Sequence, residues 1–249
     1  MPGDQAYCRT HSRTETVMKR FVLLDTTPIP NNGGALSLFE YGEDFVIKLE
    51  GGKGGQLMNT RMHGSEDALA EIPCKQVAAR PAARVLIGGL GMGFTLASAL
   101  KHLGPDAEAQ VAELVPGVIE WNRGPLGAKA GNPLNDPRTT VLNADVAQVL
   151  QAEPKGYDAI MLDVDNGPEG LTHSANTWLY SLEGLRTCAR ALRPKGLLAV
   201  WSASADRQFS QRLNQAGFKA EEVQVYAHGN RGPRHTIWIC QLKSAAGKA

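Results

Sequence analysis

The sequence predicts an α/β protein in which a mostly parallel sheet with helices on both faces follows a small N-terminal β-meander. Three observations carry this prediction. Up to residue 62, short apolar runs are separated by turn residues, and beyond Pro81 apolar runs of strand length alternate with segments of helical period. Such alternation implies parallel strands, because these need crossover connections. The 249 residues, 43% of them hydrophobic, suffice for one large α/β domain with a small extension.

The chain is expected to have three parts. Residues 1–19 are polar and predict a flexible tail, which leaves open whether Met1 or Met18 is the functional start. Residues 20–62 predict the meander, and residues 63–249 predict the α/β domain. A meander of about 40 residues cannot enclose a core alone, so it should pack on the larger domain.

The elements follow in order from apolar period and turn chemistry. The meander strands are expected over 21–24, 36–41, 45–49 and 56–58. Ser65 is a plausible N-cap for a helix that runs toward Pro73, and a second short helix is expected to end before Pro81.

Beyond Pro81, strands and helices alternate until the last two strands. Strands are expected over 84–87, 109–112, 139–142, 158–162 and 197–201, with helices near 94–103, from 116, through 146–150, and near 182–192 and 206–216. The final strands, near 221–226 and 235–242, are joined by a short segment rich in Gly and Pro. They should therefore pair antiparallel at the edge of the sheet.

Charge and cysteine content exclude several classes of protein. The 26 Lys and Arg residues nearly balance the 25 Asp and Glu residues, so no global attraction to nucleic acid or to an anionic membrane is expected. The four cysteines form no CxxC pair, and no metal site or disulfide framework is predicted. No apolar run of about 18 residues and no apolar signal core occur, which favours a cytoplasmic protein.

A glycine-rich loop gives the strongest functional signal. Gly89, Gly91 and Gly93 lie between a predicted strand and a predicted helix, where glycines let the backbone approach a ligand at the helix N-terminus. An isolated match of this kind also fits a turn without a ligand. Glu113, however, ends the next strand 20 residues beyond Gly93, where a carboxylate can accept both ribose hydroxyls. A solvated surface charge is the alternative for Glu113.

Asp145 follows the third strand of this domain. At that sheet edge it could accept a hydrogen bond from an adenine amino group, or it could cap the helix that begins at Val146. The two roles are equally supported, and one carboxylate could serve both.

The order of the strands separates the nucleotide classes. A dinucleotide needs two mononucleotide-binding halves, whereas this sheet ends in an antiparallel pair after one. S-adenosylmethionine or a relative therefore fits better than NAD. From about Arg84 to Leu242 the arrangement resembles the Rossmann-like fold of class I S-adenosylmethionine-dependent methyltransferases and related transferases.

An acidic segment follows the fourth strand. Asp163 and Asp165 lie in the run Asp-Val-Asp-Asn-Gly-Pro-Glu, where acids attract cations, although one of them could merely cap a turn. Together with the meander, Gln56 at its end and Leu179-Tyr180 after the acidic run, this segment makes the chain from about Phe21 resemble the spermidine synthase, or polyamine aminopropyltransferase, family.

The resemblance implies transfer of an aminopropyl group from decarboxylated S-adenosylmethionine to a small-molecule amine, without a metal. It implies that Asp163 and Asp165 hold the amine or accept its proton, which suits a nucleophile that must lose its charge. It also implies a homodimer with the meander at or near the interface. The implied nucleoside contacts are Gln56, Gly89, Gly91, Gly93, Glu113 and Asp145, and the implied acceptor contacts are Glu66, Asp67 and Tyr180.

Three positions depart from the family pattern. The loop acid of GGGDGG is replaced by Gly91, the Tyr-His-Glu motif falls near Ser65-Glu66-Asp67, and the DSSDP pattern reads Asp-Val-Asp-Asn from Asp163. Because the loop without its acid would repel a carboxylate less, a methyltransferase that uses intact S-adenosylmethionine is an alternative. A catalytically silent nucleoside-binding homologue is another.

Two further features have plainer interpretations. Trp201 is expected to pack in the core. Arg231, Arg234 and His235 form a basic cluster that predicts a solvated hairpin tip, with a site for an anionic substrate as the alternative.

Overall fold

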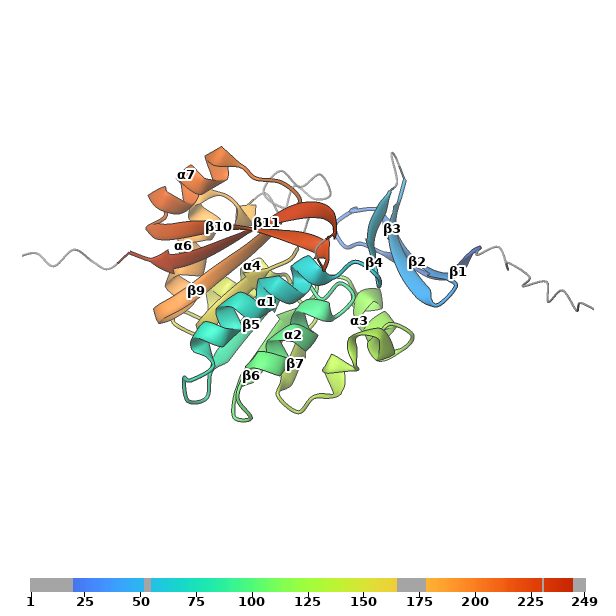
Figure 1. The fold of residues 1–249 in the computed structure, drawn as a ribbon, viewed down its shortest axis with the longest axis horizontal. Helices are drawn as coiled ribbons and strands as arrows, with labels where there is room; N and C mark the ends of the chain where they lie inside the picture. The colour runs from blue at the N-terminus through green and yellow to red at the C-terminus, as the bar shows by residue number, and fades with distance from the viewer. Residues whose placement is uncertain (1–19, 52–54, 165–177, 230, 244–249) are drawn as a thin grey trace, which may run out of the picture.

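A computed structural model describes residues 20–51, 55–164, 178–229 and 231–243. It contains a four-stranded antiparallel sheet and a seven-stranded, mostly parallel sheet (Figure 1). The smaller sheet has the order β1-β2-β3-β4 and consists of β1 (Phe21–Pro28), β2 (Ala35–Tyr41), β3 (Asp44–Glu50) and β4 (Gln56–Asn59). These strands confirm the predicted meander.

The larger sheet has the strand order β10-β11-β9-β8-β5-β6-β7. Strands β5 to β9 pair in parallel, while β11 pairs antiparallel with both β9 and β10. The expected antiparallel final pair is confirmed, and β11 lies inside the sheet while β10 forms its edge. The strands are β5 (Arg84–Gly88), β6 (Glu108–Ala112), β7 (Thr139–Leu142), β8 (Tyr157–Leu162), β9 (Leu192–Ser202), β10 (Phe218–His228) and β11 (Arg231–Leu242).

Helices cover both faces of this sheet and create two hydrophobic cores. The first core joins α1, α2 and α3 to one face, and the second joins α4, α6 and α7 to the other. The helices are α1 (Gly64–Val77), α2 (Phe94–His102), α3 (Pro116–Arg123), α4 (Val146–Ala152), α6 (Leu182–Ala191) and α7 (Arg207–Gln215), with short 3-10 turns η1 (Gly127–Ala130) and η2 (Pro133–Asn135). No helix in the described ranges is long and apolar enough to span a membrane.

The start of the α/β domain differs from the prediction. One continuous helix, α1, passes through Pro73, and the N-cap position is His63 rather than Ser65. Pro73 is buried, and α1 packs on α2 and on the strands of the large sheet, so packing offsets the backbone hydrogen bond that proline cannot donate. Ser65 lies in the first turn, where its buried hydroxyl contacts other side chains instead of capping the helix.

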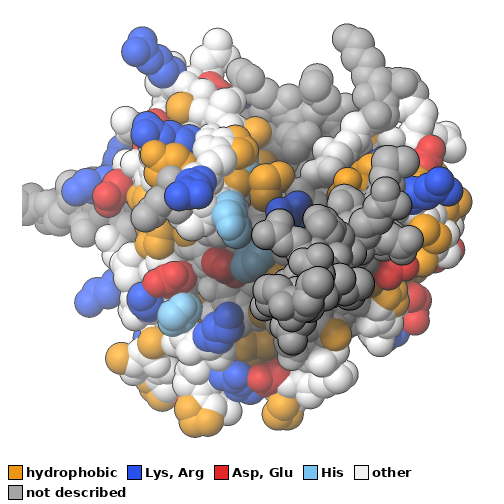
Figure 2. Space-filling model, turned by 45° about the vertical axis from the view of Figure 1, so that its right-hand side comes forward, with side chains coloured by type: hydrophobic (Ala, Val, Ile, Leu, Met, Phe, Trp, Pro, Cys, Tyr) orange, Lys and Arg blue, Asp and Glu red, His pale blue; other side chains and the backbone are white. Residues whose placement is uncertain are grey.

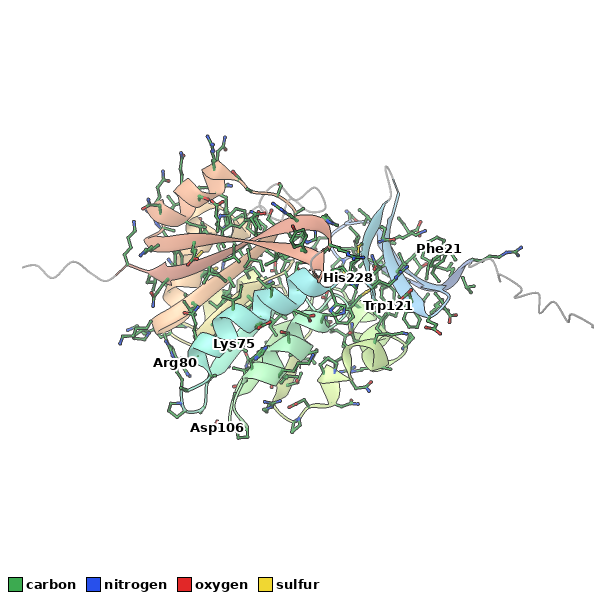
Figure 3. All side chains as sticks on the ribbon, viewed as in Figure 1. Phe21, Lys75, Arg80, Asp106, Trp121 and His228 are labelled. Atoms are coloured by element: carbon green, nitrogen blue, oxygen red, sulfur yellow. The ribbon has the colours of Figure 1, made fainter. Side chains whose placement is uncertain are left out.

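The N-terminal sheet packs on the larger domain, as its small size requires. Leu36, Leu38 and Ile47 belong to the same core as α1 and α2. The indole Nε1 of Trp121 on α3 donates a hydrogen bond of 2.7 Å to Asp25 Oδ2 on β1, and Figure 3 shows Trp121 beside this sheet. The smaller sheet therefore covers the carboxyl ends of the parallel strands, which positions the site described next.

Candidate active site

A cavity of about 400 Å³ lies between the N-terminal sheet and the carboxyl ends of the central parallel strands. The strand order changes direction at β5, which pairs with β6 on one side and with β8 on the other. Ligands of open α/β sheets bind at such a switch point. In Figure 2, acidic and histidine side chains lie next to one another near the centre of the face shown. The ionisable lining residues among those described are Glu66, Glu113, Asp145, Asp163 and His235.

The glycine loop forms one wall because its backbone adopts conformations that other residues avoid. Gly89 has a φ of +91°, and a Cβ atom there would lie 2.3 Å from the carbonyl oxygen of Asp163. Gly91 has a φ of +51° and faces the Met58 side chain. Both glycines line the cavity, whereas Gly93 does not and instead occupies the N-cap position of α2.

Glu113 is buried at the end of β6 and holds the glycine loop in place. The backbone N–H of Leu90 donates to Glu113 Oε2, and that of Val115 donates to Oε1, both at 2.8 Å. Burial raises the pKa of Glu113, although these backbone donors oppose the shift. The backbone N–H groups of Gly91 and Leu114 also interact with this carboxylate, which is therefore held at the cavity wall beside the loop.

Asp145 caps α4. Its Oδ1 accepts a hydrogen bond of 2.8 Å from the backbone N–H of Ala147, and its side chain also lines the cavity. The capping role that the sequence left open is therefore present. The cap uses one carboxylate oxygen, so the other oxygen stays available to a ligand.

Asp163 and Glu66 are two of the lining carboxyls, and their charges interact. Asp163 follows β8, and its Oδ2 accepts a hydrogen bond of 3.0 Å from Thr95 Oγ1 at the start of α2. Burial first, and then the nearby charge of Glu66, raise the pKa of Asp163 to about 7. Burial also raises the pKa of Glu66, against a hydrogen bond from Ser65. Two such carboxyls favour a bound cation, which would relieve their mutual repulsion.

A histidine from the last strand also lines the cavity. The Nδ1 atom of His235 lies 2.9 Å from Ser65 Oγ, which donates a hydrogen bond of 2.6 Å to Glu66 Oε2. The ring of Trp201 on β9 meets the His235 ring edge to face, with centroids 4.8 Å apart. Burial lowers the pKa of His235, which favours the neutral ring.

The charge of the cavity follows from these residues. Within the part of the chain that the structure describes, four carboxyl side chains line the cavity and no Lys or Arg side chain does. No group of three or more metal-ligating side chains occurs among those residues. The arrangement is suited to a cationic ligand that presents hydroxyl groups to Glu113 and positive charge to Asp163 and Glu66.

The sequence profile of the family described as Spermine/spermidine synthase domain matches residues 62–225 of this chain. The chain belongs to this family. Two relatives from Streptomyces coelicolor (strain ATCC BAA-471 / A3(2) / M145), named Polyamine aminopropyltransferase 1 and 2, are 31% and 35% identical to it. The alignments cover 58% and 61% of this chain but only 28% of each relative. Putrescine N-methyltransferase 4 of Nicotiana tabacum is 33% identical over 49% of this chain and 30% of its own length.

Solved structures of spermidine synthases share the fold. One, a complex with the transition state analogue AdoDATO, superposes with a TM-score of 0.67 at 18% identity. Another, from Thermotoga maritima, superposes with a TM-score of 0.68 at 19% identity. Each comparison covers 88% of this chain and 72% of the solved chain. The Rossmann-like fold and the small N-terminal sheet predicted from the sequence are thus confirmed.

This member of the spermine/spermidine synthase family brings some of the remaining predicted site residues to the cavity and places others elsewhere. Gln56 lines the cavity from β4, and Glu66 lines it from α1. Asp67 does not line it, because its carboxylate points to His63 at 2.8 Å. Tyr180 is buried in the second core and is not among the lining residues. Asp165 lies outside the described residues.

Met58, Trp201 and His235 are among the lining residues that were not predicted as site residues. Met58 is the next but one residue after Gln56 on β4, so strand alternation could have suggested it. Trp201 packs partly against the first core, as expected, but also lines the cavity at the carboxyl end of β9. His235 belongs to the cavity rather than to a solvated hairpin tip. The predicted solvated hairpin holds for Arg231 and Arg234, which are exposed, but is wrong for His235, because β11 lies inside the sheet and brings this residue beside the site.

Proposed function

We propose that this protein transfers an aminopropyl group from decarboxylated S-adenosylmethionine to the amine of a polyamine acceptor. The observation that carries the proposal is the set of carboxyl groups around the cavity, with no Lys or Arg among its described lining residues. Both substrates of such a reaction are cations. Membership of the spermine/spermidine synthase family and the similarity to polyamine aminopropyltransferases support the same reaction.

The positions of the side chains assign a role to each. Glu113 would accept hydrogen bonds from the ribose hydroxyls, and Asp145 would accept one from the adenine amino group. Gln56 and the loop at Gly89 and Gly91 would enclose the nucleoside. Asp163 would hold the acceptor amine and take its proton, because a carboxyl with a raised pKa is a stronger base than an ordinary aspartate. The sulfonium leaving group is already activated, so the protein contributes mainly alignment and proton removal.

Methyl transfer from intact S-adenosylmethionine is the second candidate. Gly91 stands where the family pattern has an acid, and a relative named putrescine N-methyltransferase is 33% identical over 123 residues. Intact S-adenosylmethionine, however, carries a carboxylate, and the described lining residues offer it neither a guanidinium nor an ammonium group. Burying that carboxylate beside Asp163 and Glu66 would be costly, so the decarboxylated form is the better fit.

Product analysis tests the proposal directly. The purified chain is incubated with either nucleoside and with putrescine, spermidine or spermine, and the products are identified by mass spectrometry. We expect 5′-methylthioadenosine and an aminopropylated amine from the decarboxylated nucleoside. Adenosylhomocysteine with a methylated amine would establish the second candidate instead. Calorimetric binding without any product across the panel would show a catalytically silent homologue.

Glu113→Gln is expected to weaken binding of 5′-methylthioadenosine about 10- to 100-fold. The amide replaces one acceptor oxygen with a donor, which would face a backbone N–H of Leu90 or Val115 as well as the ribose. Isothermal titration calorimetry measures the change. Glu108→Gln, at the opposite end of β6, is the control and should bind normally. Unchanged affinity in Glu113→Gln would refute the ribose assignment.

We also infer that two copies associate through β1. Four consecutive apolar residues, Phe21 to Leu24, are 42% to 56% exposed on this edge strand, and Figure 3 shows Phe21 at the outer side of the N-terminal sheet. Light scattering after size exclusion is expected to give the mass of a dimer, and Leu23→Lys is expected to give a monomer with an unchanged circular dichroism spectrum. A monomeric wild-type protein at about 50 µM would contradict this.

A further inference from the structure

We infer that His235 is a second acceptor-binding residue, which receives a hydrogen bond from the substrate amine at Nε2 while Ser65 and Glu66 hold its tautomer. This inference rests on the proposed function for the identity of the amine. Its physical basis is a continuous chain of contacts from α1 to β11, two elements that are far apart in the sequence.

The direction of the hydrogen bonds follows from counting donors. Ser65 has one hydroxyl proton, and the short contact of 2.6 Å commits it to Glu66 Oε2 when that carboxyl is ionised. Ser65 Oγ can then only accept from His235, so Nδ1 carries the proton of the neutral ring. Nε2 is left as an acceptor with a free lone pair.

Several contacts hold the imidazole in this position. Ser65 is fully buried, so water does not compete for its hydroxyl. Trp201 contacts the ring edge to face from β9. The guanidinium of the neighbouring Arg234 is directed to the hydroxyl of Tyr226 at 2.8 Å. A neutral ring that lines the cavity therefore has Nε2 as its only nitrogen available to a ligand.

The hydrogen bonds through Ser65 also couple His235 to the charge of Glu66. If Glu66 took up a proton, Ser65 would be free to donate to His235 Nδ1, and Nε2 would become a donor. A protonated amine that pairs with ionised Glu66 thus meets an acceptor at Nε2, whereas a neutral or anionic ligand gains no such match. This arrangement gives the acceptor end of the cavity a preference for ammonium groups that does not rest on Asp163 alone.

Nitrogen-15 NMR of the full chain labelled in histidine tests the tautomer and the contact without turnover. In the presence of 5′-methylthioadenosine at pH 8, we expect the Nδ1–H tautomer of His235. Added putrescine should shift the Nε2 resonance, while exposed His228 on β10, labelled in Figure 3, should not respond. An Nε2–H tautomer, or an unshifted Nε2 at a putrescine concentration that calorimetry shows to be saturating, would overturn the inference.

Kinetics separate this inference from the proposed function. His235→Phe keeps the ring contact with Trp201 but lacks an acceptor, so the KM for the acceptor amine should rise about 10- to 100-fold while nucleoside affinity stays within about twofold. His228→Gln is the matched control and should change neither. Turnover with an unchanged acceptor KM in His235→Phe would refute the role of His235 but not the proposed function. An Nε2 shift with putrescine in a wild-type protein that forms no transfer product would refute the proposed function but not the contact between His235 and the amine.

Ser65→Ala provides an independent variant in case His235→Phe fails to fold. Removing the hydroxyl frees His235 Nδ1 from Glu66, so both ring tautomers should become populated and the acceptor KM should rise. A retained single Nδ1–H tautomer in a folded Ser65→Ala protein would show that Ser65 does not position the ring.

Discussion

Asp163→Asn is expected to lower the rate of amine transfer by about 100-fold or more and, at the same time, to stabilise the protein. The asparagine keeps the shape of the side chain and can still accept from Thr95, but it cannot take a proton. A positioned base commonly contributes about 100- to 10,000-fold to a rate. Steady-state kinetics with saturating nucleoside measure the loss.

The gain in stability follows from the raised pKa of Asp163. With a pKa of about 7 in the folded protein, this carboxyl keeps a proton that the unfolded chain releases near pH 4. Stability therefore falls as the pH rises from about 4 to 7, and the uncharged Asn escapes this loss. Because Asp163 is only half-buried, we expect a gain of about 1 to 2 kcal/mol at pH 7.5, measured by urea unfolding.

Asp67→Asn is the matched control for this result. Asp67 is next to Glu66 in the sequence, but its carboxylate pairs with His63 and does not line the cavity. Its substitution should leave the rate within about twofold of wild type. Glu66→Gln should lower the titration midpoint of Asp163, because it removes the negative charge that helps to raise it. An active Asp163→Asn enzyme, or one that is destabilised, would contradict the assigned role.

The part of the site that depends on parallel strands could be predicted from the sequence. Gly89, Glu113, Asp145 and Asp163 each follow a strand of the parallel sheet, and the carboxyl ends of parallel strands meet at one edge. Once the alternation of strands and helices was recognised, the spacing along the chain placed these residues together. No contact between distant elements had to be known.

The remaining part depends on packing that periodicity does not encode. Glu66 and Asp67 are neighbours, but successive helical residues point about 100° apart, so one faces the cavity and the other His63. His235 reaches the site because β11 inserts between β9 and β10, a choice that strand patterns alone leave open. The continuation of α1 through Pro73 similarly reflects packing of the helix on α2 and the sheet, which outweighs the local penalty of a proline.

A second large effect is expected on stability, from a buried carboxylate at the end of the large sheet opposite the cavity. Asp158 lies near the start of β8, with its side chain only 4% exposed. Guanidinium groups of Arg80 and Arg193 donate to its two oxygens at 2.7 Å, and the backbone N–H of Arg84 donates at 2.9 Å. Figure 3 labels Arg80 at this end of the molecule, away from the N-terminal sheet. Asp158 thus joins segments before β5 and within β9 to the central strand.

Asp158→Ala is expected to destabilise the fold by about 2 to 4 kcal/mol at pH 7, because it leaves a half-buried backbone donor and two partly exposed guanidinium groups without this carboxylate. Burial opposes ionisation of Asp158, but the Arg84 N–H and the Arg80 guanidinium prevail and lower its pKa. The stabilisation is therefore present above about pH 4 and is lost as the pH falls through the lowered pKa. Urea unfolding at pH 7 and pH 3 should show the difference between variant and wild type shrink in acid. Glu120→Ala, which breaks an exposed ion pair with Arg123, is the control and should lower the free energy of unfolding by less than about 0.5 kcal/mol. A similarly small loss for Asp158→Ala would contradict the role of this cluster in joining the strands.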